Sequence, residues 1–202
     1  MNPRLCARLL SAAVLALSCQ LALGASTTPT RIVSTSPSVT GILLAMDAPL
    51  VASAATTPSR LTDERGFFSQ WAEVARQRGV AVLYRNLQFD IEAVIAADPD
   101  LLVVSATGAD SVVAHRSELQ AQGLETLVVD YSNQSWQDIA TALGQRTGLE
   151  QQARAAIQRF DQYTAQTAAR ITPPPGPVSV VGYNIAAVSY THLRAHETKA
   201  NL

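Results

Sequence analysis

The chain has 202 residues, which is enough for one or two domains with a substantial core. A formal net charge of -1 excludes the strongly basic balance of a nucleic-acid-binding protein, so we expect no nucleic-acid partner. The 2 cysteines, Cys6 and Cys19, both lie near the N-terminus. The rest of the chain therefore has no disulfide and no thiolate for a metal site.

The first 24 residues have the pattern of a secretory signal peptide. Arg4 and Arg8 precede an apolar run over residues 9–23, which is short for a membrane span and ends at small residues. We therefore expect residues 1–24 to direct export to the periplasm, with no membrane span in the mature form. Cys19 follows a poor match to a lipoprotein cleavage box, so a lipid anchor at Cys19 is not expected.

The last residues differ in composition from the rest. They hold the only lysine of the chain and two of its 3 histidines. Residues 188–198 back-translate to the transposase adapter that is used to prepare sequencing libraries, so we interpret residues 187–202 as adapter-derived. His192 and His196, four residues apart, imitate a helical zinc-binding pair, but this interpretation removes them as metal ligands.

Between these ends, short β-branched runs alternate with segments of helical apolar spacing. Strands are predicted at 31–35, 50–54, 81–84, 101–104 and 126–130, and helices at 38–45, 67–78, 91–97, 110–122, 135–148 and 150–170. Ser38, Asp90 and Ser135 are the expected helix-capping residues. This alternation predicts an α/β lobe with a doubly wound, mostly parallel sheet over residues 31–148.

The long helix has a particular place in this scheme. It is expected over residues 149–171, and a further strand is predicted at 178–186. A long helix followed by a new strand suggests that a second α/β lobe begins there. We therefore expect an N-terminal lobe, a connecting helix, and a C-terminal lobe that is missing apart from its first strand.

In doubly wound sheets, ligands bind beyond the carboxyl ends of the strands. The loops expected there carry Ser36 after the first strand, Arg60 and Arg65 after the second, and Tyr84 and Arg85 after the third. A guanidinium group is always charged, donates several hydrogen bonds and stacks on aromatic faces. These loops indicate an anionic, aromatic ligand, although each arginine could instead be a solvated loop charge.

Catalytic patterns are weak. There is no glycine-rich phosphate loop, and His115, the one histidine outside the tail, falls within a predicted helix. Asp98 and Asp100 flank Pro99 at the opposite end of the sheet, as turn-forming residues do. We expect no enzyme, no covalently bound cofactor and no metal held by side chains. A small secreted α/β enzyme remains the alternative from another class.

Several segments of the chain resemble the periplasmic solute-binding proteins that carry iron siderophores or cobalamin to ABC importers. The similarity runs from about Arg31 through Tyr183. The segments that carry it are 31–36, 41–49, 55–58, 66–67, 70–71, 99–102 and 105–108. Ala-Thr-Thr-Pro at 55–58 and Ser-Ala-Thr-Gly at 105–108 are closest to the branch that binds ferric enterobactin.

The resemblance implies two α/β lobes that hold a ferric siderophore between them. It implies that Arg60 contacts an anionic ferric catecholate and that Glu92 docks on the permease of the ABC importer. Arg85, Tyr84 and Ser36 are the further ligand-binding candidates. Because six catecholate oxygens already saturate the iron of such a cargo, the protein needs cations and π surfaces in place of metal ligands. Another siderophore, heme or cobalamin remains the alternative cargo.

Overall fold

A computed structural model describes residues 28–172, 175–177 and 179 of the chain. The expected signal peptide, Cys19 and the adapter-like segment 187–202 lie outside the described residues, as does the strand expected at 178–186 apart from residue 179. The chain divides into a compact unit that ends at Arg159 and a second unit that starts at Phe160. No helix within the described ranges combines the length and the apolar character that crossing a bilayer requires.

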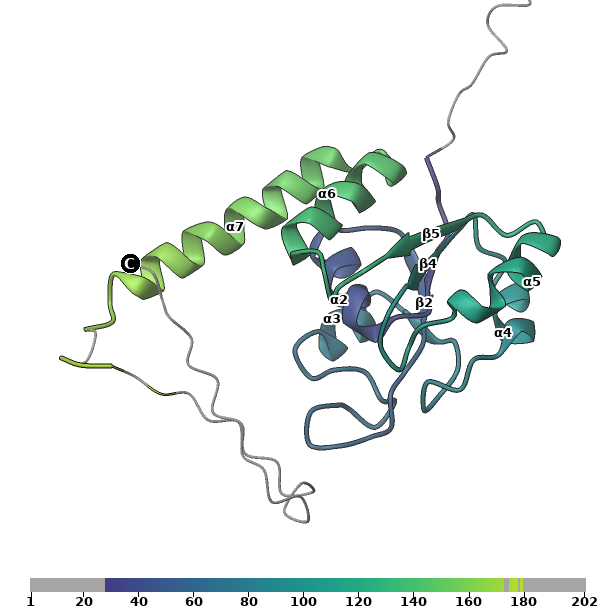
Figure 1. Ribbon diagram of the computed structural model, residues 1–202, viewed down its shortest axis with the longest axis horizontal. Coiled ribbons are helices and arrows are strands. Elements are labelled where there is room, and N and C mark those ends of the chain that lie inside the picture. The colour runs from purple at the N-terminus through teal and green to yellow at the C-terminus, as the bar shows by residue number, and fades with distance from the viewer. Residues whose placement is uncertain (1–27, 173–174, 178, 180–202) are drawn as a thin grey trace, which may run out of the picture. The chain divides into compact units, whose positions relative to one another are not determined.

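The first unit is built on a five-stranded parallel sheet (Figure 1). Its strands are β1 (Ile32–Ser34), β2 (Leu50–Ser53), β3 (Ala81–Val82), β4 (Leu101–Ser105) and β5 (Thr126–Val129). They lie in the order β3-β2-β1-β4-β5, and every pairing between neighbours is parallel. The chain moves outward from β1 to β3 and then crosses back to β4. This topology confirms the predicted doubly wound sheet and places its switch point between β1 and β4.

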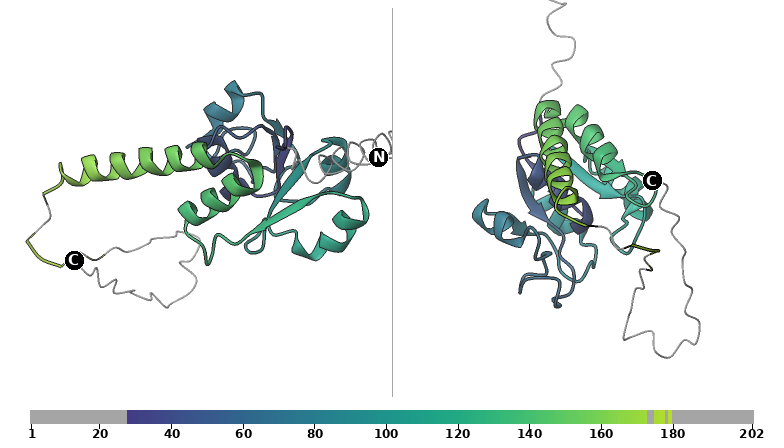
Figure 2. Two further views of the ribbon diagram at one scale, coloured as in Figure 1. Left: turned by 90° about the horizontal axis from the view of Figure 1, so that it is seen from above. Right: turned by 90° about the vertical axis from the view of Figure 1, so that its left-hand side faces the viewer.

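Both faces of the sheet are covered by helices, as Figures 1 and 2 show. One face packs against α2 (Pro37–Ala45), α3 (Ala72–Gln77), α6 (Trp136–Thr147) and the start of α7 (Glu150–Ala168). The other face packs against α4 (Ile91–Ala96) and α5 (Arg116–Ala121). Along β4, Leu101 and Val103 belong to the first core, whereas Leu102 and Val104 belong to the second. A strand covered on both sides needs a continuous apolar run, which is why β4 reads Leu-Leu-Val-Val.

Most of the predicted helix ends are confirmed. Asp90 accepts a hydrogen bond from the backbone nitrogen of Ala93 at 3.0 Å and caps α4. Ser135 and Asp138 form a capping box at the start of α6. Gly148 ends α6 in the left-handed conformation with φ of 70°.

The predicted cap at Ser38 is wrong. Helix α2 begins at Pro37, and Ser36 occupies the position before it. Proline suits the first position of a helix because its φ is already helical and its missing N–H has no intrahelical partner there. The Ser36 side chain makes no capping bond, because its hydroxyl donates to the carboxylate of Asp110.

Two predicted helices are shorter than expected. The segment 67–78 becomes a helix only from Ala72, because Phe67 lies in a loop and packs its ring 5.0 Å from that of Trp71. The segment 110–122 is a 3-10 turn, Val113–His115, followed by α5. In both segments apolar residues at helical spacing are buried by loops, so periodicity overstated the helices.

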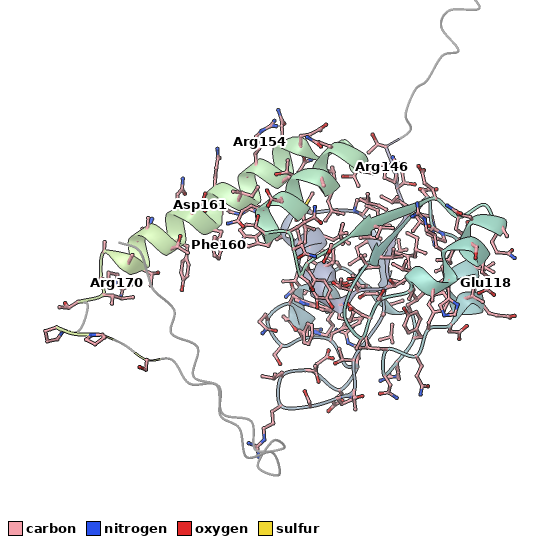
Figure 3. The ribbon with its side chains drawn as sticks, in the orientation of Figure 1. Glu118, Arg146, Arg154, Phe160, Asp161 and Arg170 are labelled. Carbon is pink, nitrogen blue, oxygen red and sulfur yellow. The ribbon has the colours of Figure 1, made fainter. Side chains whose placement is uncertain are left out.

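An ion pair between Arg146 on α6 and Glu125, the residue before β5, joins the surface of α6 to the edge of the sheet. Figure 3 shows Arg146 at the end of its helix. On its other side, α6 packs closely on α7. An added Cβ at Gly144 would lie only 2.9 Å from the Cβ of Ala153. The small residue at position 144 therefore lets the two helices approach, as the views in Figure 2 also show.

Candidate functional site

The carboxyl ends of β1 and β4 meet at the switch point of the sheet, and polar side chains join the loops there. Ser36, which follows β1, is fully buried and donates its hydroxyl to Asp110. Asp110 is itself only 5% exposed, and its other carboxylate oxygen accepts a hydrogen bond from the Tyr131 hydroxyl at 2.6 Å. The loops after β1, β4 and β5 are thus tied together through one carboxylate.

A depression of about 110 Å³ opens beside this carboxylate. It is lined by Pro37, Ser38, Thr56, Phe68, Leu87, Ala109, Asp110 and Tyr131. Pro37 and Ser38 begin α2, which follows β1, and the other residues come from the loops after β2, β3, β4 and β5. This is the location that a doubly wound fold favours for a ligand. The volume suits one small group of a larger ligand, so the rest of such a ligand would lie across the surrounding surface.

Arg60 lies in the loop after β2 and is exposed. Among the described residues, no hydrogen bond or ion pair engages its guanidinium group. Its charge is therefore available at the edge of the sheet where the sequence placed a ligand.

Arg65 lies in the same loop but has a different role. Its guanidinium donates to Asp63 at 3.0 Å and to the backbone oxygen of Ala72 at 2.9 Å, and it stacks 4.7 Å from the centre of the Phe67 ring. These contacts fold the loop onto the start of α3. Within the described residues, Arg65 is thus engaged by its own loop, whereas Arg60 is not.

Tyr84 and Arg85 follow β3, but their side chains occupy different environments. Tyr84 is 8% exposed and meets the Phe89 ring edge to face at 5.9 Å, and its burial raises the pKa of its hydroxyl. Arg85 is exposed, and within the part of the chain that the structure describes its guanidinium makes only long contacts of 3.3 and 3.4 Å with backbone oxygens of the loop after β2. Arg85 is therefore a second loosely held cation on this edge, whereas Tyr84 belongs to the core.

Glu92 lies in the first turn of α4 and is exposed. Because α4 follows β3, its N-terminus lies at the same edge of the sheet as the loops that carry Arg60 and Arg85. Glu92 thus stands at the ligand edge, on the side covered by α4 and α5.

Sequence reasoning missed Asp110, Tyr131 and Leu87 as site residues. Asp110 falls within the helix predicted over 110–122, and Tyr131 directly follows the strand predicted over 126–130. The available signal was position alone, since Asp110 and Tyr131 lie in the segments that follow two adjacent parallel strands, β4 and β5. Their hydrogen bond connects loops 21 residues apart in sequence, which no local pattern encodes.

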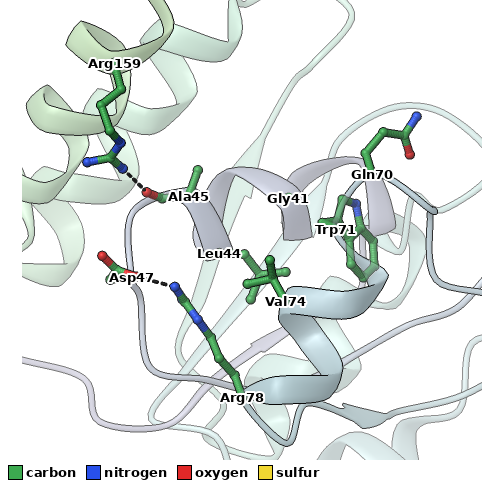
Figure 4. Close-up of a pocket in the computed structure, with 9 residues that line it drawn as sticks. All are labelled: Gly41, Leu44, Ala45, Asp47, Gln70, Trp71, Val74, Arg78 and Arg159. Atoms are coloured by element: carbon green, nitrogen blue, oxygen red, sulfur yellow. Dashed lines mark hydrogen bonds and ion pairs between the residues drawn. The ribbon is translucent and has the colours of Figure 1, made fainter.

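A second depression, of about 340 Å³, lies beside the C-terminal end of α2 (Figure 4). Its two guanidinium groups already have partners: Arg159 donates to the backbone oxygen of Ala45 at 2.9 Å, and Arg78 pairs with Asp47. The first contact satisfies a carbonyl at the end of the helix. Since α2 leads from the carboxyl end of β1 to the start of β2, this depression lies at the edge away from the candidate site.

The residues that could suggest other chemistry have structural roles. His115 stacks on Phe89, with ring centroids 4.4 Å apart, at an exposed position. The carboxylate of Asp100 accepts hydrogen bonds from the backbone nitrogens of Thr30 and Arg31, so it fixes the entry to β1. Within the described part of the chain, no three His, Cys, Asp or Glu side chains come together as a metal ion would require.

A family model described as "Periplasmic binding protein" matches residues 32–184, which include every strand of the sheet and the loops at both of its edges. The chain belongs to the periplasmic binding protein family. This membership agrees with the doubly wound sheet and with an arrangement in which ligand-facing loops follow the strands.

Two similar proteins make the comparison more specific. The chain is 46% identical over 162 residues to the ferric enterobactin-binding periplasmic protein FepB of Escherichia coli O6:H1 (strain CFT073), and this covers 80% of the chain and 50% of FepB. The crystal structure of holo-ViuP matches with a TM-score of 0.69 and 45% identity, over 78% of this chain and 51% of ViuP. The chain thus spans about half the length of these relatives.

A more distant match bears on the fold alone. The siderophore-binding protein BauB, solved with a complex of acinetobactin and ferric iron, is 19% identical with a TM-score of 0.54, over 78% of this chain and 54% of BauB. The lobe architecture is therefore retained where little sequence identity remains.

Proposed function

We propose that the full-length gene product that contains this chain is a periplasmic binding protein for a ferric catecholate siderophore. The observation that carries the proposal is the 46% identity with FepB over 162 residues, which covers 80% of this chain. Identity at that level over most of the chain supports a shared class of cargo.

The charges at the carboxyl edge support this cargo. A ferric ion bound by three catecholates carries three negative charges, and its iron has no open coordination position. Such a ligand is recognised by charge-assisted hydrogen bonds and aromatic contacts. Arg60 and Arg85 offer exposed guanidinium groups of that kind. We assign both residues to ligand binding, together with Ser36 and Tyr84 as buried residues that shape the same loops.

The proposal includes delivery of the cargo to an ABC importer. We propose that Glu92 docks on a cationic residue of the permease, since its carboxylate is exposed in the first turn of α4 at the ligand edge. A binding protein of this kind is not an enzyme and carries no covalently bound cofactor. Export by a signal peptide at residues 1–24, without a lipid anchor at Cys19, is part of the same proposal.

Tryptophan fluorescence of the full-length gene product tests the cargo. Trp71 is buried in the first core, and Trp136 packs against that core. Ferric enterobactin is expected to quench their emission with a dissociation constant of about 1 µM or tighter, which corresponds to about -8 kcal/mol. N-acetyltryptophanamide, titrated in parallel, corrects for light absorbed by the ferric complex.

Other cargoes provide the comparison. Heme, cobalamin and a neutral ferric hydroxamate are titrated under the same conditions. If the protein binds any of these more tightly than ferric enterobactin, that ligand replaces the catecholate as the proposed cargo. Absence of saturable quenching by all of them would refute the proposed function.

A further inference from the structure

The buried carboxylate of Asp110 organises the depression at the switch point. A carboxylate loses hydration on burial, and this cost is offset only when donors face it. Here each oxygen has its own donor, the Ser36 hydroxyl on one side and the Tyr131 hydroxyl at 2.6 Å on the other. Asp110 is thereby hydrogen-bonded to the segment after β1 and to the loop after β5, and it fixes the direction of the Tyr131 ring.

The turn that carries Tyr131 is held by the residue before it. The preceding Asp130 accepts hydrogen bonds from the backbone nitrogen of Ser132 at 3.0 Å, from Asn133 at 2.7 Å and from the Thr107 hydroxyl at 3.1 Å. The ring between these anchors is half-buried and lines the depression. Burial and the hydrogen bond to Asp110 raise the pKa of the Tyr131 hydroxyl, so it remains a donor at neutral pH.

Gly108 shows how closely the backbone is fitted to this pair. Its φ is +85°, and an added Cβ would lie 1.8 Å from the Tyr131 hydroxyl oxygen and 2.8 Å from a carboxylate oxygen of Asp110. Only glycine permits both this conformation and this approach. The loop after β4 is therefore shaped around the hydroxyl of Tyr131.

The depression also contains an unusual backbone. Asn86 and Leu87 both have left-handed φ values, 57° and 55°, although neither is glycine. A hydrogen bond of 3.1 Å from the Leu87 nitrogen to the Ala55 oxygen holds this conformation, and the Leu87 side chain lines the depression. Such conformations are costly for a leucine and cluster at ligand sites, where the surrounding structure maintains them.

We propose that Tyr131 and Leu87 are ligand-contacting residues that hold a flat apolar part of the cargo, and that Asp110 is the positioning residue for Tyr131. The inference rests on the proposed function. It adds to it an aromatic and apolar subsite beside the cationic one that Arg60 and Arg85 form. Phe68 and Pro37 add apolar surface to a lining that also holds Ser38, Thr56 and Asp110, and this mixture suits the edge of a hydroxylated aromatic ring. The Asp110 charge disfavours anionic oxygens nearby, so the iron-bound oxygens are left to Arg60 and Arg85.

The contact residues are tested by titrating the full-length gene product with ferric enterobactin. Tyr131→Ala and Leu87→Ala are each expected to weaken binding at least tenfold. Tyr131→Phe, which keeps the ring but not the hydroxyl, is expected to weaken binding less than Tyr131→Ala. The matched control is Val74→Ala, a half-exposed apolar residue of α3 at the other depression, which should bind as the unaltered protein does.

The positioning role of Asp110 is tested by a pair of substitutions. Asp110→Ala leaves Tyr131 without its acceptor and should weaken binding at least tenfold. Asp110→Asn keeps one acceptor oxygen for the Tyr131 hydroxyl, and its amide NH2 can donate to the Ser36 hydroxyl oxygen in place of accepting from it. Because the Tyr131 bond is kept and a negative charge is removed, the affinity should match that of the unaltered protein or exceed it. Melting temperatures, recorded for each variant, set a titration temperature at which all are folded.

The outcomes separate this inference from the proposed function. If the unaltered protein binds no ferric siderophore, the proposed function fails. If it binds and Tyr131→Ala and Leu87→Ala bind equally well, only the subsite is overturned. If Asp110→Asn binds ferric enterobactin as weakly as Asp110→Ala, the positioning role is overturned. Should Asp110→Ala fail to fold, the role is still tested, because Asp110→Asn must bind as tightly as the unaltered protein.

Discussion

Asp63 accepts two hydrogen bonds from Arg65, one from the backbone nitrogen and one from the guanidinium Nε, at 2.9 and 3.0 Å. The same carboxylate accepts a third from the backbone nitrogen of Phe67 at 2.9 Å. Arg65 is therefore occupied in folding its loop, whereas Arg60, five residues earlier in the same loop, is exposed. Two arginines that look alike in the sequence thus differ in what they are available to do.

Substituting each of these arginines should separate binding from stability. Arg60→Ala is expected to weaken binding of ferric enterobactin about tenfold or more, which is about 1.4 kcal/mol, and to leave the melting temperature unchanged. Arg65→Ala removes hydrogen bonds to Asp63 and Ala72 and should lower the free energy of unfolding by about 1–3 kcal/mol. Titration and urea denaturation measure the two quantities. An exposed arginine of α7, Arg154, provides the control for loss of one positive charge, and equal binding losses for Arg154→Ala and Arg60→Ala would contradict a specific role (Figure 3).

Acid should weaken the loop that Asp63 organises. Burial alone would raise the pKa of Asp63, but hydrogen bonds from Phe67 and Arg65 and the nearby guanidinium charge outweigh it and lower the pKa. A lowered pKa means that the stabilisation is fully present above the ordinary value of about 3.9 and is lost as the pH falls through the folded-state value. The free energy of unfolding of the unaltered protein should therefore fall more steeply below about pH 4 than that of Asp63→Asn. Parallel curves for the two proteins would remove Asp63 from this account.

The contact between α6 and α7 should not tolerate a methyl group. In Gly144→Ala the new Cβ would lie 2.9 Å from the Cβ of Ala153 and 3.2 Å from the backbone oxygen of Leu149. Overpacking of this kind costs about 1–3 kcal/mol, which exceeds the gain of up to about 1 kcal/mol from the better helix propensity of alanine. Thr141→Ala, at an exposed position of the same helix, isolates the propensity effect. A stabilised Gly144→Ala protein would show that the two helices move apart at little cost.

The capping box of α6 makes a measurable contribution to stability. The Ser135 hydroxyl accepts a hydrogen bond from the backbone nitrogen of Asp138 at 3.1 Å, and the Asp138 carboxylate in turn faces Ser135. Ser135→Ala should lower the free energy of unfolding by about 1 kcal/mol, whereas Ser135→Asp keeps an acceptor and should cost less. Denaturant unfolding of both variants checks the order, and an equal loss for the two would argue against capping as the cause.

Much of the lobe was determined by local sequence. The run Leu101–Val104 is typical of a strand covered on both faces, since it has no polar side to turn to solvent. The caps at Asp90 and Ser135 and the stop at Gly148 follow from hydrogen-bonding and backbone preferences that act within four residues. Alternating strands and helices then leave few topologies, and the doubly wound order is one of them.

The candidate site depended on more distant contacts. Sequence position placed Arg60 and Arg65 in one loop, but only the folded loop shows that Asp63 and Phe67 engage the second of them. Local apolar spacing extended a helix to Phe67, because a buried loop aromatic and a helical one have the same hydropathy. Apolar periodicity indicates that a residue is buried, but it does not indicate whether that residue lies in a helix or in a loop.

Asp110 shows most clearly which contacts local sequence does not predict. Its neighbours along the chain suggest the start of a helix, whereas its partners Ser36 and Tyr131 are 74 and 21 residues away. The sequence by itself determined the order of strands and helices, because hydrogen bonds within a few residues and continuous apolar runs specify them. Only the tertiary structure decided which polar side chains meet at the switch point, because parallel strands bring their carboxyl ends together regardless of how far apart they lie in the chain.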